Sequence, residues 1–229
     1  MNSMNSDLYR KLDQSQTYQD ALLRVQHRLD TGHSRYIIGI AGLPGSGKST
    51  LGDYIALRLN QTHPNQVISV SMDGFHLSKA QLSTFPDVEA AFARRGAPWT
   101  FDSQRFYQHL VDFKQPDQKP LTWPSFDHTQ GDPVEGSISI PSEARILIVE
   151  GLYVLHNQHG FEHVQKLLDE KWFIDLPIEA AMKQLTMRHQ QAWGISLDEA
   201  QQRIASNDAL NAQIVEQTKN RADYFLSVK

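Results

Sequence analysis

The sequence contains no cysteine in its 229 residues. This absence excludes disulfides, thiolate metal sites and a cysteine nucleophile, and it fits a reducing compartment. Strong charge of one sign is also missing, because the formal net charge is only −4. Without a basic field, we expect neither a nucleic acid nor a membrane as partner, and any polyanion must be held by a local site.

Long hydrophobic runs are absent as well. No apolar run approaches the ~18 residues that would span a bilayer, and the opening MNSMNSDLYR lacks the basic and apolar segments of a secretory signal. Hydrophobic residues make up 40% of the chain and charged residues 21%, which is typical of a globular protein. We therefore expect a soluble, cytoplasmic protein.

A glycine-rich stretch, GIAGLPGSGKST, has the G-x-x-x-x-G-K-[ST] spacing of a phosphate-binding loop. It follows a short apolar strand pattern and opens a helix, so its backbone N–H groups can face phosphate oxygens. Lys48 can neutralise the β- and γ-phosphates, Ser49 can ligate Mg²⁺, and Thr50 can hold the α-phosphate. The predicted nucleotide-binding residues are Gly42, Gly45, Ser46, Gly47, Lys48, Ser49 and Thr50.

The order of strand, loop, helix and strand predicts a βαβ unit. We expect one α/β domain over residues 1–229, with the P-loop NTPase fold of nucleoside kinases: a parallel sheet with helices on both faces. Other predicted parts are an N-terminal helix (1–34), strands (67–72, 146–149, 171–177, 224–228), a substrate-side insertion (77–141) with a helix opened by Asp102, and a lid with following helices (177–220).

Two carboxylates are predicted at the carboxyl edge of this sheet, where ligands of open parallel sheets bind. Asp73 follows the second strand and can act as general base toward an attacking hydroxyl; an Asp-Gly turn is the alternative. Glu150 ends a buried strand and can complete a Mg²⁺ shell with Ser49; a helix cap is the alternative. ATP and Mg²⁺ are the expected cofactors.

Several classes of nucleotide-binding protein are disfavoured. The chain has no N-K-x-D segment for guanine, no signature of transporter ATPases, and no array of basic and aromatic residues that tracks a nucleic-acid strand. These absences favour a kinase with a small-molecule acceptor.

Five segments occur in order: GLPGSGKST, SMDGFH, RRGAPWTFD, PSFDHTQGD and VEGLYVL. From about Ile37 to Asn211 the chain thereby resembles the phosphoribulokinase and uridine kinase family of P-loop kinases, with segments most similar to bacterial type I pantothenate kinase. The resemblance implies ATP-dependent phosphoryl transfer to the hydroxyl of a sugar, sugar acid, nucleoside or pantothenate-like compound. It also implies that Asp73 is the catalytic base and Glu150 the magnesium-associated carboxylate.

The resemblance implies further site residues. Arg95 would steer an anionic substrate group, whereas Arg94 is expected to be an exposed, solvated charge. Phe126 and His128 would line the acceptor pocket, with a surface histidine as the alternative for His128. The helix after Pro177 resembles the family's lid, and Arg188 would clamp ATP phosphates unless it is simply solvated.

The sequence also departs from the family pattern. Phe126 stands where uridine kinases carry tyrosine, and the H-x-R arrangement that follows it there is missing. Thr186 and Met187 replace the aromatic lid residues of pantothenate kinases. We therefore expect an acceptor among sugars, sugar acids and related hydroxyl compounds.

Two points stay open. Asn207, Asp208 and Asn211 after the lid can contact such an acceptor or form a polar helix face. An ATP-binding regulatory protein, or a slow ATPase that acts with a protein partner, is the alternative function, and a homodimer is a possible assembly.

Overall fold

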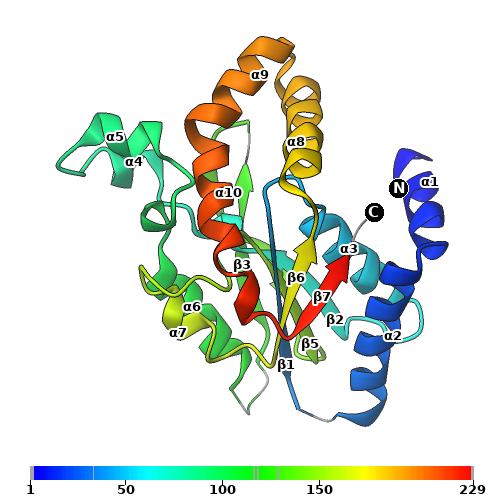
Figure 1. Cartoon of the computed structure of the whole chain (residues 1–229). Helices are drawn as coiled ribbons and strands as arrows, with labels where there is room; N and C mark the ends of the chain where they lie inside the picture. Colours follow the sequence, from blue (N-terminus) through cyan, green and yellow to red (C-terminus); the bar gives the residue numbers. More distant parts are fainter. Residues whose placement is uncertain (1–2, 33, 116, 118, 128, 228–229) are drawn as a thin grey trace.

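The core of the computed structural model is a five-stranded sheet in the order β2-β5-β1-β6-β7, in which every neighbouring pair is parallel (Figure 1). The structure describes residues 3–32, 34–115, 117, 119–127 and 129–227. The strands are β1 (Tyr36–Gly42), β2 (Val67–Ser71), β5 (Ile146–Glu150), β6 (Glu170–Asp175) and β7 (Tyr224–Ser227). The connection from β5 to β6 passes across β1. In open parallel sheets ligands bind where the strand order changes direction, so the ligand crevice is expected at the carboxyl end of β1.

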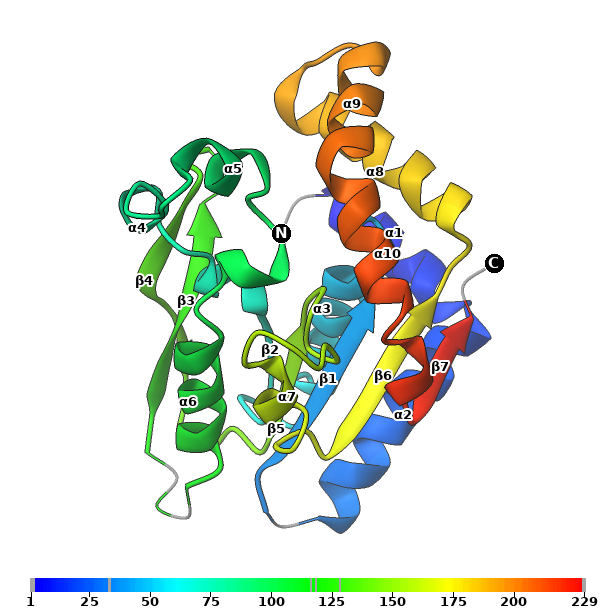
Figure 2. The ribbon, with the colours of Figure 1, turned by 60° about the vertical axis from the view of Figure 1, so that its left-hand side comes forward.

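Helices cover both faces of the sheet (Figures 1 and 2). One apolar cluster joins one face of the sheet to α2 (Gln16–Thr31) and α3 (Lys48–Leu59). The other joins the opposite face to α6 (Ser103–Phe113), α7 (Phe161–Val164) and α10 (Ala209–Glu216). The predicted parallel α/β sheet is therefore confirmed. No helix in the described part of the chain is long and apolar enough to cross a membrane.

Three predicted elements differ in detail. The expected N-terminal helix is two helices, α1 (Ser3–Asp13) and α2, because Ser15 has extended backbone at the N-cap of α2. The second strand ends at Ser71, since Met72–Phe75 forms a 3₁₀ turn, η1.

The C-terminal helices also differ from the prediction. The lid helix α8 (Ile178–Trp193) is followed by a capping box at Ser196 and Glu199, as expected. The next helix is interrupted by a π-helical turn, η3 (Ile204–Asp208), which separates α9 (Leu197–Arg203) from α10.

The predicted insertion has more regular structure than the sequence pattern indicated. It holds α4 (Lys79–Leu82), α5 (Val88–Ala93), the 3₁₀ turn η2 (Pro98–Thr100) and α6, whose N-cap is Asp102 as predicted. Of these, only α6 was predicted, and a further unpredicted element is an antiparallel hairpin of β3 (Leu121–Asp127) and β4 (Asp132–Ile140).

This hairpin packs directly on the turn that carries Asp73. The fully buried Trp123 donates its indole N–H to the carbonyl oxygen of Ser71 at 2.8 Å. A Cβ at Gly74 would lie 2.0 Å from the carbonyl oxygen of Pro124. Only glycine allows this approach, so the hairpin and the segment of Asp73 are packed as one unit.

Gly74→Ala should destabilise the protein by about 1–3 kcal/mol, because either η1 or β3 must move to admit the methyl group. Chemical denaturation measures the change. The control is Gly32→Ala, where the nearest atoms to an added Cβ belong to the flexible guanidinium end of Arg28. Equal stability of the two variants would contradict the close packing of hairpin and turn.

Candidate active site

The phosphate loop between β1 and α3 lies against the lid helix. Gly45 and Gly47 have φ values of 81° and 89°, which side chains with a Cβ rarely adopt. A Cβ at Gly45 would also lie 2.6 Å from the carbonyl oxygen of Ala181 in α8. The glycines therefore permit both the turn of the loop and its contact with the lid helix.

Lys48 is buried in the loop, with 8% of its surface exposed. Its ammonium group donates to the main-chain carbonyl oxygens of Gly42 and Leu43, both at 3.0 Å. The hydroxyl of Ser46 is buried and has no hydrogen-bond partner within the described chain. Among the described residues, the ammonium group of Lys48 is hydrogen-bonded to carbonyl oxygens, and the hydroxyl of Ser46 is unpaired. Both features fit a loop that receives phosphate oxygens.

Ser49 and Glu150 meet at the sheet edge. The Ser49 hydroxyl donates to the carboxylate of Glu150 at 3.0 Å, and Glu150 is the last residue of β5 with only 5% of its surface exposed. Burial raises the pKa of Glu150, the charge of Lys48 opposes this, and the charge of Asp73 adds to it. The same burial lowers the pKa of Lys48 against the attraction of both carboxylates.

Asp73 lies half-buried in η1, with its N–H bonded to the Ser71 hydroxyl at 3.1 Å. Its charge acts on both Lys48 and Glu150, and the charge of Arg188 in the lid helix also lowers the pKa of Lys48. Arg188 itself is exposed to solvent. The structure thus brings the loop lysine, the two strand-end carboxylates and the lid arginine into one electrostatic group.

Aromatic rings form the acceptor side beside Asp73. The His76 ring contacts the rings of Phe101 and Phe126, with centroids 4.0 and 4.5 Å away and planes tilted by 39° and 40°. Its Nδ1 lies 2.8 Å from the carbonyl oxygen of Asp73. Phe126 therefore lies near the turn of Asp73, whereas His128 is outside the described residues.

The two arginines of the RRGAPWTFD segment are both engaged in the structure. Arg95 pairs with Asp132 of β4 at 2.9 Å, and its guanidinium carbon lies 5.4 Å from the Phe126 ring centroid. Arg94 is not the exposed, solvated charge that the sequence suggested: it is half-buried and donates to the side-chain oxygens of Asn207 at 2.7 Å and Asn211 at 3.1 Å.

These contacts also change the interpretation of the polar segment after α8, which contains Asn207 and Asn211. Asn207 also donates to the carbonyl oxygen of Arg95 at 2.8 Å, and Asn211 is 2% exposed. The two residues are four apart, so they share one side of the helical segment, and their amides connect the C-terminal helices to the insertion. A solvent-facing polar helix face was the wrong interpretation.

Sequence reasoning missed two site residues, His76 and Tyr153. Tyr153 is fully buried, and its hydroxyl donates to the carbonyl oxygen of Gly96 at 2.6 Å. Both lie within segments that carry the family resemblance, but only the carboxylates of those segments were interpreted. An aromatic residue shortly after each strand-end carboxylate was the available signal.

The chain belongs to the phosphoribulokinase / uridine kinase family, whose model matches residues 37–228. It is therefore a P-loop kinase, a phosphotransferase that binds a nucleotide. The fold, the loop and the order of the five segments agree with this membership.

Among its relatives, a Schizosaccharomyces pombe protein named "Putative uridine kinase C227.14" is 38% identical over 196 residues, which cover 84% of this chain and 83% of that protein. An "ATP-dependent kinase-like protein notR'" of Aspergillus versicolor is 40% identical over 155 residues, 66% of this chain and 88% of that protein. A similar solved structure is a "putative fructose transport system kinase" from Silicibacter sp. TM1040, with TM-score 0.79, 30% identity, and coverage of 92% of this chain and 99% of that one.

Lys48→Met should weaken ADP binding by about 10- to 100-fold, because it removes charge-assisted bonds to phosphate while keeping a buried side chain of similar length. Isothermal titration calorimetry with ADP measures the loss. Lys166→Met, at an exposed lysine after α7, is the matched control and should bind like the parent. Unchanged ADP affinity in Lys48→Met would exclude the loop as the phosphate site.

Proposed function

We propose that the protein is an ATP-dependent kinase that transfers the γ-phosphoryl group to a hydroxyl group of a small molecule. The observation that carries this proposal is that Glu150, which is hydrogen-bonded to Ser49 beside Lys48, pairs in register with Ser71, two residues before Asp73, at the carboxyl edge of the sheet. A GTP switch or a motor-like ATPase needs only a lysine such as Lys48 and a magnesium-associated carboxylate such as Glu150. A kinase also needs a group that accepts the proton of the acceptor hydroxyl, and Asp73, next to aromatic rings, is such a carboxylate.

The phosphate loop supplies the nucleotide site. Its backbone N–H groups, together with Lys48, Ser46 and Thr50, would hold the phosphates. Ser49 and Glu150 would hold Mg²⁺, an ion that commonly takes one or two protein ligands and completes its shell with phosphate and water oxygens. The described residues contain no group of three His, Cys, Asp or Glu side chains that could hold a metal by itself. When bound, the ion would neutralise charge on the phosphates.

Asp73 is proposed as the general base. Its carboxylate would accept the proton of the attacking hydroxyl, and the Nδ1 contact of His76 with the Asp73 carbonyl would keep the turn in place. Arg188 would approach the phosphates when the lid closes and offset charge on the transferred group. Arg95 is assigned a positioning role, because Asp132 already neutralises it.

We propose a sugar or sugar acid as the acceptor. The relative from Silicibacter is named for fructose and the one from Schizosaccharomyces for uridine, so the names alone do not decide. Phe126 lacks the hydroxyl that uridine kinases carry at this position, and the missing H-x-R arrangement would leave polar groups of a nucleoside unpaired at about 1–3 kcal/mol each. These departures favour a smaller acceptor.

The alternative is an ATP-binding regulatory protein, or a slow ATPase that acts with a protein partner. ADP release with Mg-ATP, measured across sugars, sugar acids, nucleosides and pantothenate, separates the functions. Stimulation by one compound supports the kinase and identifies its acceptor class. A background rate with every compound, despite ATP binding, supports the alternative.

Asp73→Asn should lower acceptor-dependent turnover by about 10²- to 10⁴-fold while ADP affinity stays near the parent value, because the amide cannot accept the proton. Steady-state ADP release and calorimetry measure the two quantities. Asp112→Asn, at a half-buried aspartate in α6 that accepts a hydrogen bond from Gln108, is the control. Full turnover in Asp73→Asn would remove Asp73 from the mechanism.

Glu150→Gln should raise the Mg²⁺ concentration needed for half-maximal turnover by about tenfold or more, since a charged ligand is replaced by a neutral one. The variant should also lower the stability of the protein, because it leaves the buried charge of Lys48 without the opposite charge of Glu150. A Mg²⁺ titration of the rate tests the first expectation and a thermal melt the second. The exposed Glu143→Gln is the control, and an unaltered Mg²⁺ requirement would contradict the metal role.

A further inference from the structure

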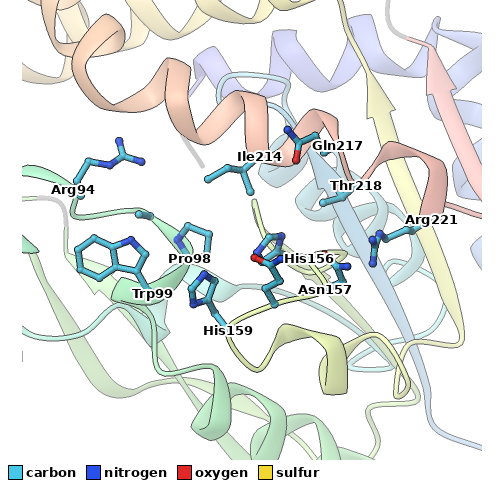
Figure 3. Close-up of a pocket in the computed structure, with 12 residues that line it drawn as sticks. Arg94, Pro98, Trp99, His156, Asn157, His159, Ile214, Gln217, Thr218 and Arg221 are labelled. Atoms are coloured by element: carbon cyan, nitrogen blue, oxygen red, sulfur yellow. The ribbon is translucent and has the colours of Figure 1, made fainter.

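A cavity of about 390 Å³ lies between η2, the loop after β5 and the end of α10 (Figure 3). Its lining includes Arg94 and Trp99 on one side and Thr218 and Arg221 on the other, with His156 between them. No residue of the phosphate loop lines it, and neither do Asp73 and Glu150. Small-molecule sites commonly have volumes of ~300–1,000 Å³, so the cavity is large enough for a ligand of its own.

The charged side chains that line this cavity are of one sign, although the carboxylate of Glu162 in α7, which does not line it, acts on His156. The lining of the cavity contains two arginines and no carboxylate. Arg94 is bonded to amide and carbonyl oxygens of Asn207 and Asn211, which leave its positive charge uncompensated. The guanidinium group of Arg221 forms no hydrogen bond or ion pair with another described residue, and its Nε is buried without a partner. Two guanidinium groups without a counter-ion favour an anionic ligand.

His156 provides an independent observation. It is 7% exposed, and its Nε2 is buried without a hydrogen-bond partner among the described residues. Burial, and then the neighbouring His159 and Arg221, lower the pKa of His156 to about 4, so its ring is neutral at neutral pH. A neutral imidazole with a proton on Nε2 can donate one hydrogen bond to a ligand oxygen.

The partial negative charge at the carboxyl end of α10 does not outweigh the attraction of the two arginines and His156 for an anion. The carboxyl end of α10 carries partial negative charge, which alone would repel an anion. However, the carbonyl oxygen of Val215 already accepts the N–H of Thr218 at 2.9 Å and its hydroxyl at 2.7 Å. Arg221 comes after α10 in the chain, and its positive charge offsets the rest of the partial negative charge at this helix end.

We propose that this cavity binds a small organic oxyanion of sugar size, a phosphate ester or a carboxylate, attracted by Arg94 and Arg221 and hydrogen-bonded by His156. The half-buried ring of Trp99 offers an apolar wall, and the amide of Gln217 can bond to ligand hydroxyls. The site is separate from the phosphate loop, and the proposal does not depend on the kinase mechanism.

Calorimetry on the full chain tests the proposal, with saturating Mg-ADP so that the phosphate loop is filled. The probes are inorganic phosphate, glycerol phosphate and glycerate, whose comparison separates phosphate from carboxylate recognition. Arg221→Gln should weaken the bound probe about 10-fold or more, as expected for loss of a charge-assisted contact. Arg10→Gln, at an exposed arginine of α1, is the matched control and should bind like the parent.

A second variant and a spectroscopic readout cover a failure of Arg221→Gln to fold. His156→Phe should also weaken the probe, and in the parent protein the bound oxyanion should raise the pKa of His156 above its value of about 4, as followed by NMR of the imidazole. Three results would each overturn the proposal. One is the absence of binding at millimolar probe, and another is equal affinity of the parent and the Arg221→Gln variant. The third is binding that is lost in Lys48→Met rather than in Arg221→Gln. Asp73→Asn should keep this binding, so a failed kinase assay and a failed binding assay are distinguishable.

Discussion

The burial of Lys48 next to Glu150 is the constraint on which the rest of the site depends. A lysine taken out of water needs opposite charge close by, and a buried glutamate needs the same. The sheet order provides both, because β5 lies beside β1 and ends in Glu150 at the level where the glycine loop begins. Ser49 is bonded to this pair through Glu150, and the charge of Asp73 acts on both of its members.

Local signals in the sequence were sufficient to predict most of the framework. The G-x-x-x-x-G-K-[ST] spacing, the apolar run before Glu150 and the capping box at Ser196 each depend on neighbouring residues, and the structure confirms the elements that they predict. The predicted βαβ order also holds, since right-handed crossover leaves few alternatives.

Contacts between distant segments could not be predicted in the same way. The bond between Arg94 and Asn207 joins residues far apart in the chain, so two adjacent arginines gave no reason to expect an internal contact. The hairpin was missed because Pro124 and Pro133 lie in its strands, and proline disfavours strand assignment. The break between α1 and α2 depends on the extended backbone of Ser15. The spacing of apolar residues carries no information about such a change in a single residue.

The packing of Gly74 against the Pro124 carbonyl limits how such a protein can diversify. The strand that carries Phe126 and the turn that carries Asp73 touch through main-chain atoms, with Trp123 bonded to Ser71 beside them. A mutation that shifts this strand therefore also shifts the carboxylate of Asp73. In this chain the residues around Phe126 can change without moving Asp73 only where the new side chain leaves the main chain of β3 in place.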